Sequence, residues 1–317
     1  MSSHWTQRKP NWPMIIYLAI VHLGALLGLV AAMASKWQTL LFAFLLWPIT
    51  GLGITGGVHR LWAHRSYKAH WTVRVFLMLC NSGANQGSIY HWSRDHRVHH
   101  KHSETDADPH NASNGFFFAH IGWLLVKKHP KVLEAGKGLS FDDLLEDPVV
   151  AFQKALDPFF ALFMCFGLPT LVARSYWGEH WLNALLVAGF LRYCAVLHFT
   201  WLVNSAAHLY GDRPYDPSSG PRENLLVAVA SIGEGWHNWH HKYPFDYAAS
   251  EFGVSERFNP TKLFIDTCAT MGIVWDRKRG LDAWAVAKQK RARDEPEKPA
   301  AVPKKASHSI PFGIGCL

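Results

Sequence analysis

Four long apolar stretches constrain the fold of this chain more than any other feature. A helix needs about 20 apolar residues to cross the hydrocarbon core of a bilayer. Stretches of about that length run over residues 14–33, 40–58, 158–177 and 181–203. The sequence therefore predicts an all-α integral membrane protein with four transmembrane helices. The fourth stretch contains Arg192, which needs a polar partner or a water-filled pocket at that depth.

The order of these stretches places most of the chain on one side of the membrane. Residues 34–39 and 178–180 are short connections on one side, so residues 1–13, 59–157 and 204–317 lie together on the other. All but three of the 32 Lys and Arg residues fall on that second side; the exceptions are Lys36, Arg174 and Arg192. Positive charge marks the cytoplasmic face. We therefore expect cytosolic termini and a cytosolic helical cap built from residues 59–157 and 204–282.

Charge and cysteine usage narrow the class further. Lys and Arg exceed Asp and Glu by eight, which indicates an anionic partner or anionic lipid. Nucleic acid is excluded as a partner because the basic residues flank membrane-length segments and match no nucleic-acid motif. The five cysteines show no paired spacing, so no disulfide framework is expected. Residues 283–317 carry little apolar surface, and we predict a basic, disordered tail with at most one helical turn near Trp284.

Histidines cluster in four segments of the predicted cap. The segments supply nine imidazoles and one amide, from His59, His64, His96, His99, His100, His208, His237, His240, His241 and Asn204. Neutral imidazole suits Zn, Cu, Fe and Ni. Nine imidazoles are more than one ion can use, so the count predicts a dinuclear metal site.

The spacing of the histidines indicates their geometry. Residues three and four apart share one face of a helix, so the histidines of residues 96–100 converge, as do those of residues 237–241. Asn204 and His208 are likewise four apart. His59 and His64 are five apart, about 140° around an α-helix. The spacing therefore predicts that His59 and His64 serve different ions.

Iron is the metal that this ligand set favours. A closed zinc site takes four ligands, whereas two five-coordinate ions with room for an exchangeable oxygen ligand use nine imidazoles well. The soluble carboxylate di-iron design needs two Glu-x-x-His helices and two further Glu. Glu234-x-x-His237 is the one useful match, so that design is rejected. Glu104, Asp106 and Asp108 are expected to orient ligating histidines from behind.

Five strings resemble one known family. They are HRLWAHRSY (59–67), WSRDHRVHH (92–100), SETDADPHN (103–111), NSAAHLYG (204–211) and GEGWHNWHH (233–241). In this order they are similar to the membrane fatty acyl-CoA desaturases of the stearoyl-CoA Δ9 type, over about residues 50–275. The resemblance implies that the nine histidines hold two iron ions, with a water held by the Asn204 amide.

The same resemblance implies a set of substrate contacts. The acyl chain would lie in a kinked tunnel with Trp92 and Thr200 at the bend and Trp201 near the thioester carbonyl. Four residues would hold the coenzyme A headgroup: Arg94, Asp95, Lys127 and Lys128. Trp47 and Gly51 would limit chain length, with Trp47 stopping the tail. Gly87 departs from the pattern because relatives carry an amide there, which leaves the headgroup geometry open.

The expected reaction is O2-dependent introduction of a cis double bond, at carbon 9, into a saturated long-chain acyl-CoA. The chain has no haem-attachment motif, flavin fingerprint or cytochrome domain, so a separate protein must donate electrons; the resemblance implies cytochrome b5 with its reductase, in the endoplasmic reticulum membrane. Three alternatives remain open at this point: an acyl-lipid desaturase, a histidine-rich hydroxylase or alkane monooxygenase, and a membrane metal-transport protein.

Overall fold

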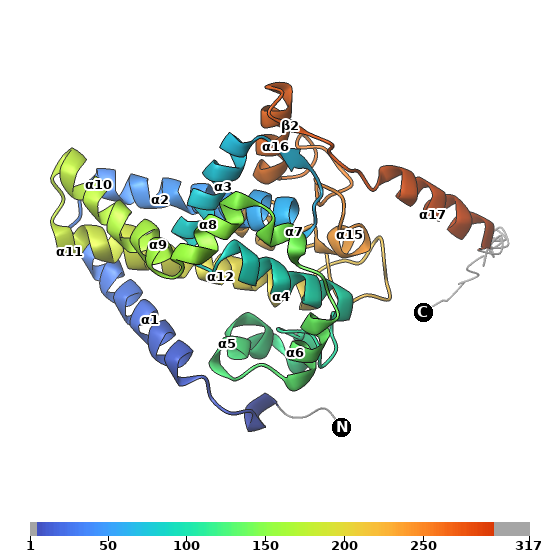
Figure 1. Ribbon diagram of the computed structural model, residues 1–317, viewed down its shortest axis with the longest axis horizontal. Coiled ribbons are helices and arrows are strands. Elements are labelled where there is room, and N and C mark those ends of the chain that lie inside the picture. The colour runs from blue at the N-terminus through green and yellow to red at the C-terminus, as the bar shows by residue number, and fades with distance from the viewer. Residues whose placement is uncertain (1–4, 295–317) are drawn as a thin grey trace, which may run out of the picture. The chain divides into compact units, whose positions relative to one another are not determined.

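Four helical segments long and apolar enough to cross a membrane dominate the structure (Figure 1). The computed structural model describes residues 5–294. The four candidate spans are Trp12–Ala32, Trp37–Ala63, Phe159–Trp177 and Trp181–Leu209. The prediction of an all-α membrane protein with four transmembrane helices is confirmed. A single two-stranded antiparallel ladder, β1 (Lys68–Ala69) with β2 (Val274–Trp275), is the only sheet in the described part of the chain.

Three of the four spans combine α-helical and π-helical segments. The first span is α1 (Trp12–Ala32), and the second is α2 (Trp37–Leu52) followed by η2 (Gly53–Ala63). The third comprises α9 (Phe159–Leu162), η5 (Phe163–Gly167) and α10 (Leu168–Trp177). The fourth comprises α11 (Trp181–Ala184), η6 (Leu185–Leu191), α12 (Arg192–Asn204) and α13 (Ala206–Leu209). The second and fourth spans continue past residues 58 and 203, because the histidines that follow the apolar stretches are buried and the helices do not end there.

Arg192 finds its partner in the backbone. Its Nη1 donates to the Gly83 carbonyl (2.9 Å), its Nη2 to the Cys165 carbonyl (2.7 Å) and its Nε to the Ala188 carbonyl (3.1 Å). Cys165 lies in η5 and Ala188 in η6, where the π-helical pattern leaves carbonyls outside the regular i→i+4 ladder. The guanidinium therefore satisfies backbone groups that lipid cannot.

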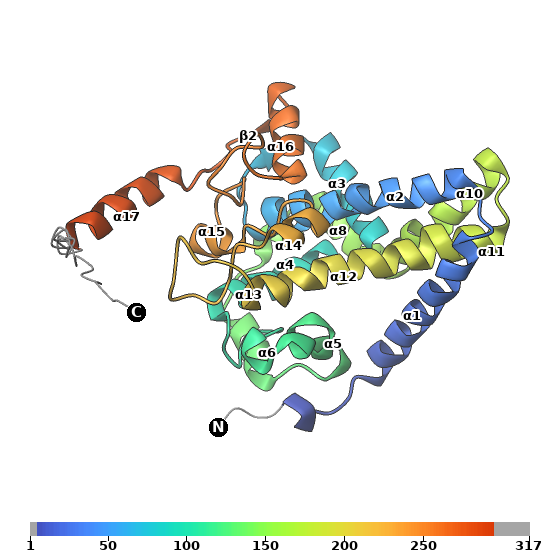
Figure 2. The ribbon, with the colours of Figure 1, turned by 180° about the vertical axis from the view of Figure 1, so that it is seen from behind.

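The cap packs against one end of the spans. Its helices are α3 (Trp71–Ala84), α4 (Ile89–His102), α5 (Trp123–Leu125), α6 (Pro130–Lys137), α7 (Asp142–Leu145), α8 (Pro148–Leu156), α14 (Leu225–Ala230), α15 (His237–Lys242) and α16 (Pro260–Thr270), with short turns η1 (Trp5–Gln7), η3 (Ala112–Asn114) and η4 (Phe118–Gly122). The two opposite views show α14 and α15 beside the far end of α12, and α3 and α4 beside the end of the second span (Figures 1 and 2). Val58, Leu77 and Ile265 lie in one buried core that joins η2, α3 and α16.

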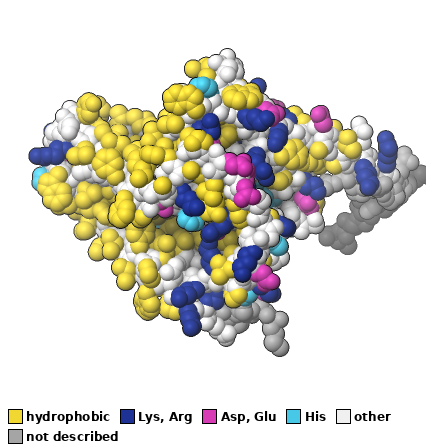
Figure 3. Space-filling view, viewed as in Figure 1, with side chains coloured by type: hydrophobic (Ala, Val, Ile, Leu, Met, Phe, Trp, Pro, Cys, Tyr) yellow, Lys and Arg dark blue, Asp and Glu magenta, His cyan; other side chains and the backbone are white. Residues whose placement is uncertain are grey.

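The surface divides into an apolar part and a charged part. Large apolar side chains of α1, such as Leu26 (62% exposed) and Val30 (68% exposed), face outward, as a lipid-facing helix requires. Figure 3 shows hydrophobic side chains covering the spans on this face, whereas Lys, Arg, Asp and Glu gather over the cap. This distribution fits a protein embedded in a membrane with a water-facing cap.

The C-terminal segment corrects one prediction. A separate unit begins at Leu281, and its described part is the helix α17 (Leu281–Asp294). The predicted disordered tail with one turn near Trp284 was therefore wrong up to Asp294. The segment from Ala283 to Lys290 is rich in Ala, Lys and Gln, which are strong helix formers, and this propensity outweighs its low apolar content. Residues 295–317 of the predicted tail lie outside the described residues.

Candidate metal centre

Nine imidazoles gather in two adjacent groups at the junction of the spans and the cap. The five-histidine group contains His59, His64, His96, His100 and His240, and the four-histidine group contains His99, His208, His237 and His241. Within each group the ligand nitrogens lie within 4.8 Å of one another. Every histidine singled out from the sequence belongs to one of the two groups.

Each His-x-x-His-His segment contributes to both groups. On α4, His96 and His100 face the five-histidine group, while His99 faces the other. On α15, His240 joins the five-histidine group and His237 and His241 the other. The two helices therefore lie between the groups and connect them. The i, i+3, i+4 spacing predicted that the three histidines of each segment converge. The structure instead divides each set of three between the two groups.

His59 and His64 share one group, which contradicts the prediction that they serve different ions. The segment that carries His59 is the π-helix η2, and His64 is its C-terminal cap. The His64 amide donates to the His59 carbonyl (3.0 Å), a bond between residues five apart. In a π-helix this pattern places residues i and i+5 on the same face, so the two rings lie 4.8 Å apart. The α-helical angle of the sequence argument does not apply.

The nitrogen geometry fits metal ions. Imidazole nitrogens bind a divalent ion at about 2.0–2.1 Å, so two ligands at right angles stand about 3.0 Å apart. His240 Nε2 lies 3.0 Å from both His59 Nε2 and His100 Nε2. His237 Nε2 lies 3.1 Å from both His208 Nε2 and His241 Nε2. One ring nitrogen carries at most one proton and cannot serve two such partners, whereas a shared cation satisfies all of them.

Carboxylates hold the opposite ring nitrogens of three histidines. His99 Nδ1 lies 2.9 Å from Asp108 Oδ1, His208 Nδ1 lies 3.5 Å from Glu104 Oε1, and His59 Nδ1 lies 3.2 Å from Glu234 Oε2. The hydrogen bond to Asp108 fixes the His99 tautomer that leaves Nε2 free to bind a metal, and the other two carboxylates stand at ion-pair distance behind His208 and His59. The contacts agree with the expectation for Asp108 and Glu104. Asp106 was assigned wrongly, because it is paired with Lys131 on the surface.

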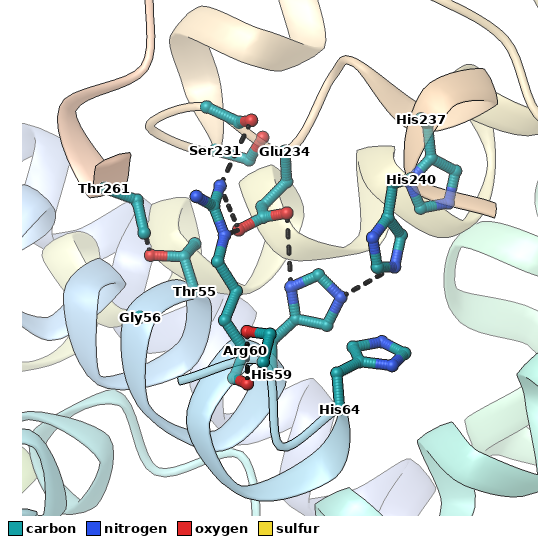
Figure 4. A network of polar contacts seen from close by, with 12 residues as sticks. Thr55, Gly56, His59, Arg60, His64, Ser231, Glu234, His237, His240 and Thr261 are labelled. Atoms are coloured by element: carbon teal, nitrogen blue, oxygen red, sulfur yellow. Dashed lines mark hydrogen bonds and ion pairs between the residues drawn. The ribbon is translucent and has the colours of Figure 1, made fainter. Parts of the chain in front are cut away.

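Glu234 is a carboxylate behind a histidine ligand, and the sequence analysis did not assign it this position. It belongs to neither histidine group. Arg60 donates from Nε to Glu234 Oε1 (3.0 Å), and the other face of the carboxylate meets His59 (Figure 4). Burial alone would raise the pKa of Glu234, but the Arg60 guanidinium and His59 hold it below its ordinary value. A charged carboxylate therefore stands directly behind a ligand of the five-histidine group.

The imidazoles are in the neutral form that metals bind. Burial lowers the pKa of His96 and His100 well below the ordinary value, and the neighbouring histidines lower it further. The same two causes act in the same direction on His237, His240 and His241. The rings therefore offer lone pairs at neutral pH and do not carry charge.

Two cavities meet beside the histidine groups. An inner cavity of about 50 Å³ runs from the metal centre into the spans, where Trp47, Gly51 and Phe199 line it. An outer cavity of about 360 Å³ opens toward the cap. Four residues line both cavities: Trp92, His96, Thr200 and Asn204. The two cavities therefore lie side by side at the histidine groups, separated or joined only by these four residues.

Most of the predicted substrate residues lie along this path. Trp201, Asp95 and Lys128 line the outer cavity, and Asp95 forms an ion pair with Lys128. Arg94 and Lys127 line neither cavity. Arg94 lies against Asp95 (3.0 Å), and Lys127 is exposed.

An amide that the sequence analysis overlooked lies at the junction. Gln86 lines the outer cavity, and its Nε2 donates to Thr200 Oγ1 (2.9 Å). The neighbouring Gly87 has a φ of +90° and also lines this cavity. No local signal distinguished Gln86, because its role depends on contact with a residue 114 positions later.

Comparison with known proteins agrees with this geometry. The family model described as fatty acid desaturase matches residues 35–251. The chain belongs to the fatty acid desaturase family. Human stearoyl-CoA desaturase 5 is 51% identical over 283 residues, covering 89% of this chain and 85% of that protein. Mouse stearoyl-CoA desaturase 2 is 52% identical, covering 89% and 78%. The acyl-CoA Delta-9 desaturase of Acheta domesticus is 53% identical, covering 86% and 76%.

Proposed function

We propose that this desaturase introduces a cis double bond, at carbon 9, into a saturated long-chain fatty acyl-CoA. One observation carries the proposal: two groups of imidazoles stand where an apolar cavity lies beside a polar-mouthed one. The relatives named stearoyl-CoA and acyl-CoA Delta-9 desaturases suggest the substrate and the position of the new bond.

Trp92 and Thr200 would set the position of the reacting carbons. Both side chains line both cavities. An acyl chain has no polar handle at its middle, so shape has to select the carbons. The hydrogen bond from Gln86 holds the Thr200 hydroxyl in place. A chain bent at this point would present the cis geometry of the product.

The two ends of the acyl-CoA would meet different surroundings. Trp47 donates from Nε1 to the Ala230 carbonyl (3.0 Å) and packs its ring against Phe199 (5.2 Å), which closes the inner cavity. We assign the methyl end to this position, with Gly51 beside it. Asp95 and Lys128 at the outer cavity would contact the headgroup, with Arg94 and Lys127 nearby and Trp201 at the thioester.

The metal is assigned as two iron ions held by the nine histidines, with a water held by the Asn204 amide. Bound iron would supply the activation of O2 that removal of hydrogen from an unactivated methylene requires. The balanced reaction takes one acyl CH2–CH2 unit, O2, two electrons and two protons, and yields CH=CH and two waters. Asp108, Glu104 and Glu234 would keep His99, His208 and His59 in the ligating tautomer.

The electrons would come from a separate protein, and cytochrome b5 with its reductase is the proposed donor. An acidic partner suits a basic cap electrostatically. We place the protein in the endoplasmic reticulum membrane with cytosolic termini. Asn111 opens an Asn-x-Ser acceptor sequence but cannot report this orientation, because its side chain is buried and accepts from the Ser113 amide (2.9 Å). An acceptor sequence engineered at the exposed Gly138 is suitable and should stay unglycosylated in a eukaryotic host.

The decisive test is product analysis. The full-length protein, expressed in a desaturase-deficient host, should convert saturated acyl chains to cis-9 monoenes without incorporating oxygen. His99→Ala should abolish the product while the protein still inserts in the membrane, and the exposed His70→Ala should not. A hydroxylated product would identify a hydroxylase or monooxygenase, and activity with zinc as the only metal would contradict the assignment of iron.

A further inference from the structure

A second, smaller set of metal-type ligands lies within the membrane spans, away from the nine histidines. His22 of α1 and His198 of α12 bring their Nε2 atoms to 3.1 Å. Cys194 lies one helical turn before His198, and its Sγ and the two ring nitrogens all lie within 4.8 Å of one another. Neither His22 nor Cys194 lines the two substrate cavities, so the proposed reaction does not use them.

A chain of polar contacts holds the second ring nitrogen of His198. His198 Nδ1 lies 2.9 Å from His120 Nε2, and His120 Nδ1 lies 2.9 Å from the Ser205 hydroxyl. The Ser205 hydroxyl in turn lies 2.8 Å from the Trp201 carbonyl. His198 can therefore place its proton on Nδ1, toward His120, and keep a lone pair on Nε2.

A backbone carbonyl fixes the tautomer of His22. Its Nδ1 lies 2.7 Å from the Leu18 carbonyl, which can only accept. The proton of a neutral His22 is thus on Nδ1, and its Nε2 turns a lone pair toward His198 Nε2 at 3.1 Å. A metal ion bound to both Nε2 atoms fits this arrangement, with the proton of His198 on Nδ1, toward His120.

The nine-histidine centre of this chain has the same pattern. There too, Nε2 atoms face one another at about 3 Å, and carboxylates hold Nδ1 atoms from behind. At the His22–His198 pair, the Leu18 carbonyl and His120 take the place of the carboxylates. Fixing a ligand through its second ring nitrogen is what metal sites in proteins commonly do.

We propose that His22, His198 and Cys194 bind a thiophilic d10 metal ion, Cu(I) or Zn(II), separate from the nine-histidine centre. Thiolate and imidazole ligands select these ions. Of the two, Cu(I) is the better match, because one thiolate and one monovalent ion make a neutral complex and a net charge is costly inside a membrane span. The competing arrangement holds no ion: His198 carries its proton on Nε2 and donates it to His22 Nε2, which leaves the Cys194 thiol without a role.

X-ray absorption on the purified full-length protein tests the site, because sulfur is absent from the nine-histidine centre. The protein is supplied with one equivalent of Cu(I) under reducing conditions, or of Zn(II), and spectra are taken at both edges. We expect a sulfur shell at about 2.3 Å. This shell should disappear in Cys194→Ser and persist in Cys80→Ser, a matched buried cysteine of α3 outside the cluster.

A second pair of variants covers the histidines and any loss of folding. His22→Asn should release the added equivalent of metal, whereas His70→Asn, an exposed histidine, should retain it. Thermal unfolding of all four variants in the same detergent identifies any that do not fold. A wild-type protein with no metal–sulfur scattering at either edge, or a sulfur shell that survives Cys194→Ser, would overturn the proposal.

Discussion

Replacing Asp108 by Asn should weaken metal binding at the four-histidine group. Asp108 is 2% exposed, and its two oxygens serve three donors. Oδ1 accepts from His99 Nδ1 (2.9 Å) and from the His110 amide (3.1 Å), and Oδ2 accepts from the Glu104 amide (2.9 Å). An amide has one oxygen only, so in Asp108→Asn an NH2 group must face at least one of these N–H groups.

The expected cost follows from that count. A buried donor left without an acceptor costs about 1–3 kcal/mol. Either orientation of the amide disturbs a residue behind this group: one faces the NH2 toward His99, and the other faces it toward the amide of Glu104, which stands behind His208. The loss therefore appears as weaker metal binding, and removing an outer partner of a ligand typically lowers affinity about 10–100-fold. That range corresponds to about 1.4–2.8 kcal/mol, in agreement with the hydrogen-bond figure. Asp106, two residues earlier, provides the control, because its exposed pair with Lys131 contributes little to stability.

The assay is metal content per chain for wild type, Asp108→Asn and Asp106→Asn after equilibration at a series of buffered metal concentrations. Asp108→Asn should need a 10–100-fold higher free metal concentration for half occupancy, and Asp106→Asn should overlay the wild type. Thermal unfolding of the apoprotein measures the part of the cost that is structural. If the two variants bind metal equally well, the assignment of Asp108 as a support of the four-histidine group is wrong.

Three further predictions concern the acyl tunnel, pH and the buried arginine. Trp47→Ala should extend the accepted acyl-chain length, and each added buried methylene should contribute about 0.8 kcal/mol, or roughly fourfold in selectivity. Acyl-CoA profiling measures this chain-length preference. Phe44→Ala, on the lipid side of Trp47, should leave the profile unchanged. Burial raises the pKa of Glu223 from 4.5 to about 7. The folded protein then binds this proton more tightly than the unfolded chain, so stability falls as pH rises between those values. Glu223→Gln should remove this pH dependence of stability and unfold at a higher temperature than wild type at pH 8. An equal pH dependence of the unfolding temperature in both proteins would refute this role of Glu223. Arg60→Lys should lower the free energy of unfolding by about 3 kcal/mol, because Arg60 donates to a carboxylate and to backbone carbonyls that one ammonium group cannot reach together. Arg65 is largely exposed, so Arg65→Lys should have a free energy of unfolding near that of wild type.

Properties that depend on short stretches of the chain could be predicted from the sequence. The length of an apolar run determines whether a helix can cross a bilayer, so the four spans followed from the residues alone. The histidine segments and the family were equally local, because they are strings of neighbouring residues. Where two local signals compete, the prediction failed. In α17, helix propensity outweighed the low hydrophobicity from which a disordered tail was predicted.

Grouping of the ligands was decided by tertiary structure. His59 and His64 share a group only because packing holds η2 in a π-helix, whose hydrogen bonds are five residues long. Nothing in the spacing of two histidines reveals which helix type they will occupy. The same holds for Glu234, whose contact with Arg60 joins residues 174 positions apart.

The amino-acid sequence by itself therefore determined the class of protein, its membrane spans and its supply of imidazoles. Which nitrogens group together, which carboxylates stand behind them and which residues line both cavities were decided only when the cap packed onto the spans. The physical reason is the distance along the chain over which each property is determined. Hydrophobic length and residue type act along the chain, whereas coordination geometry is set by atoms that packing brings to within 3–4 Å from distant segments.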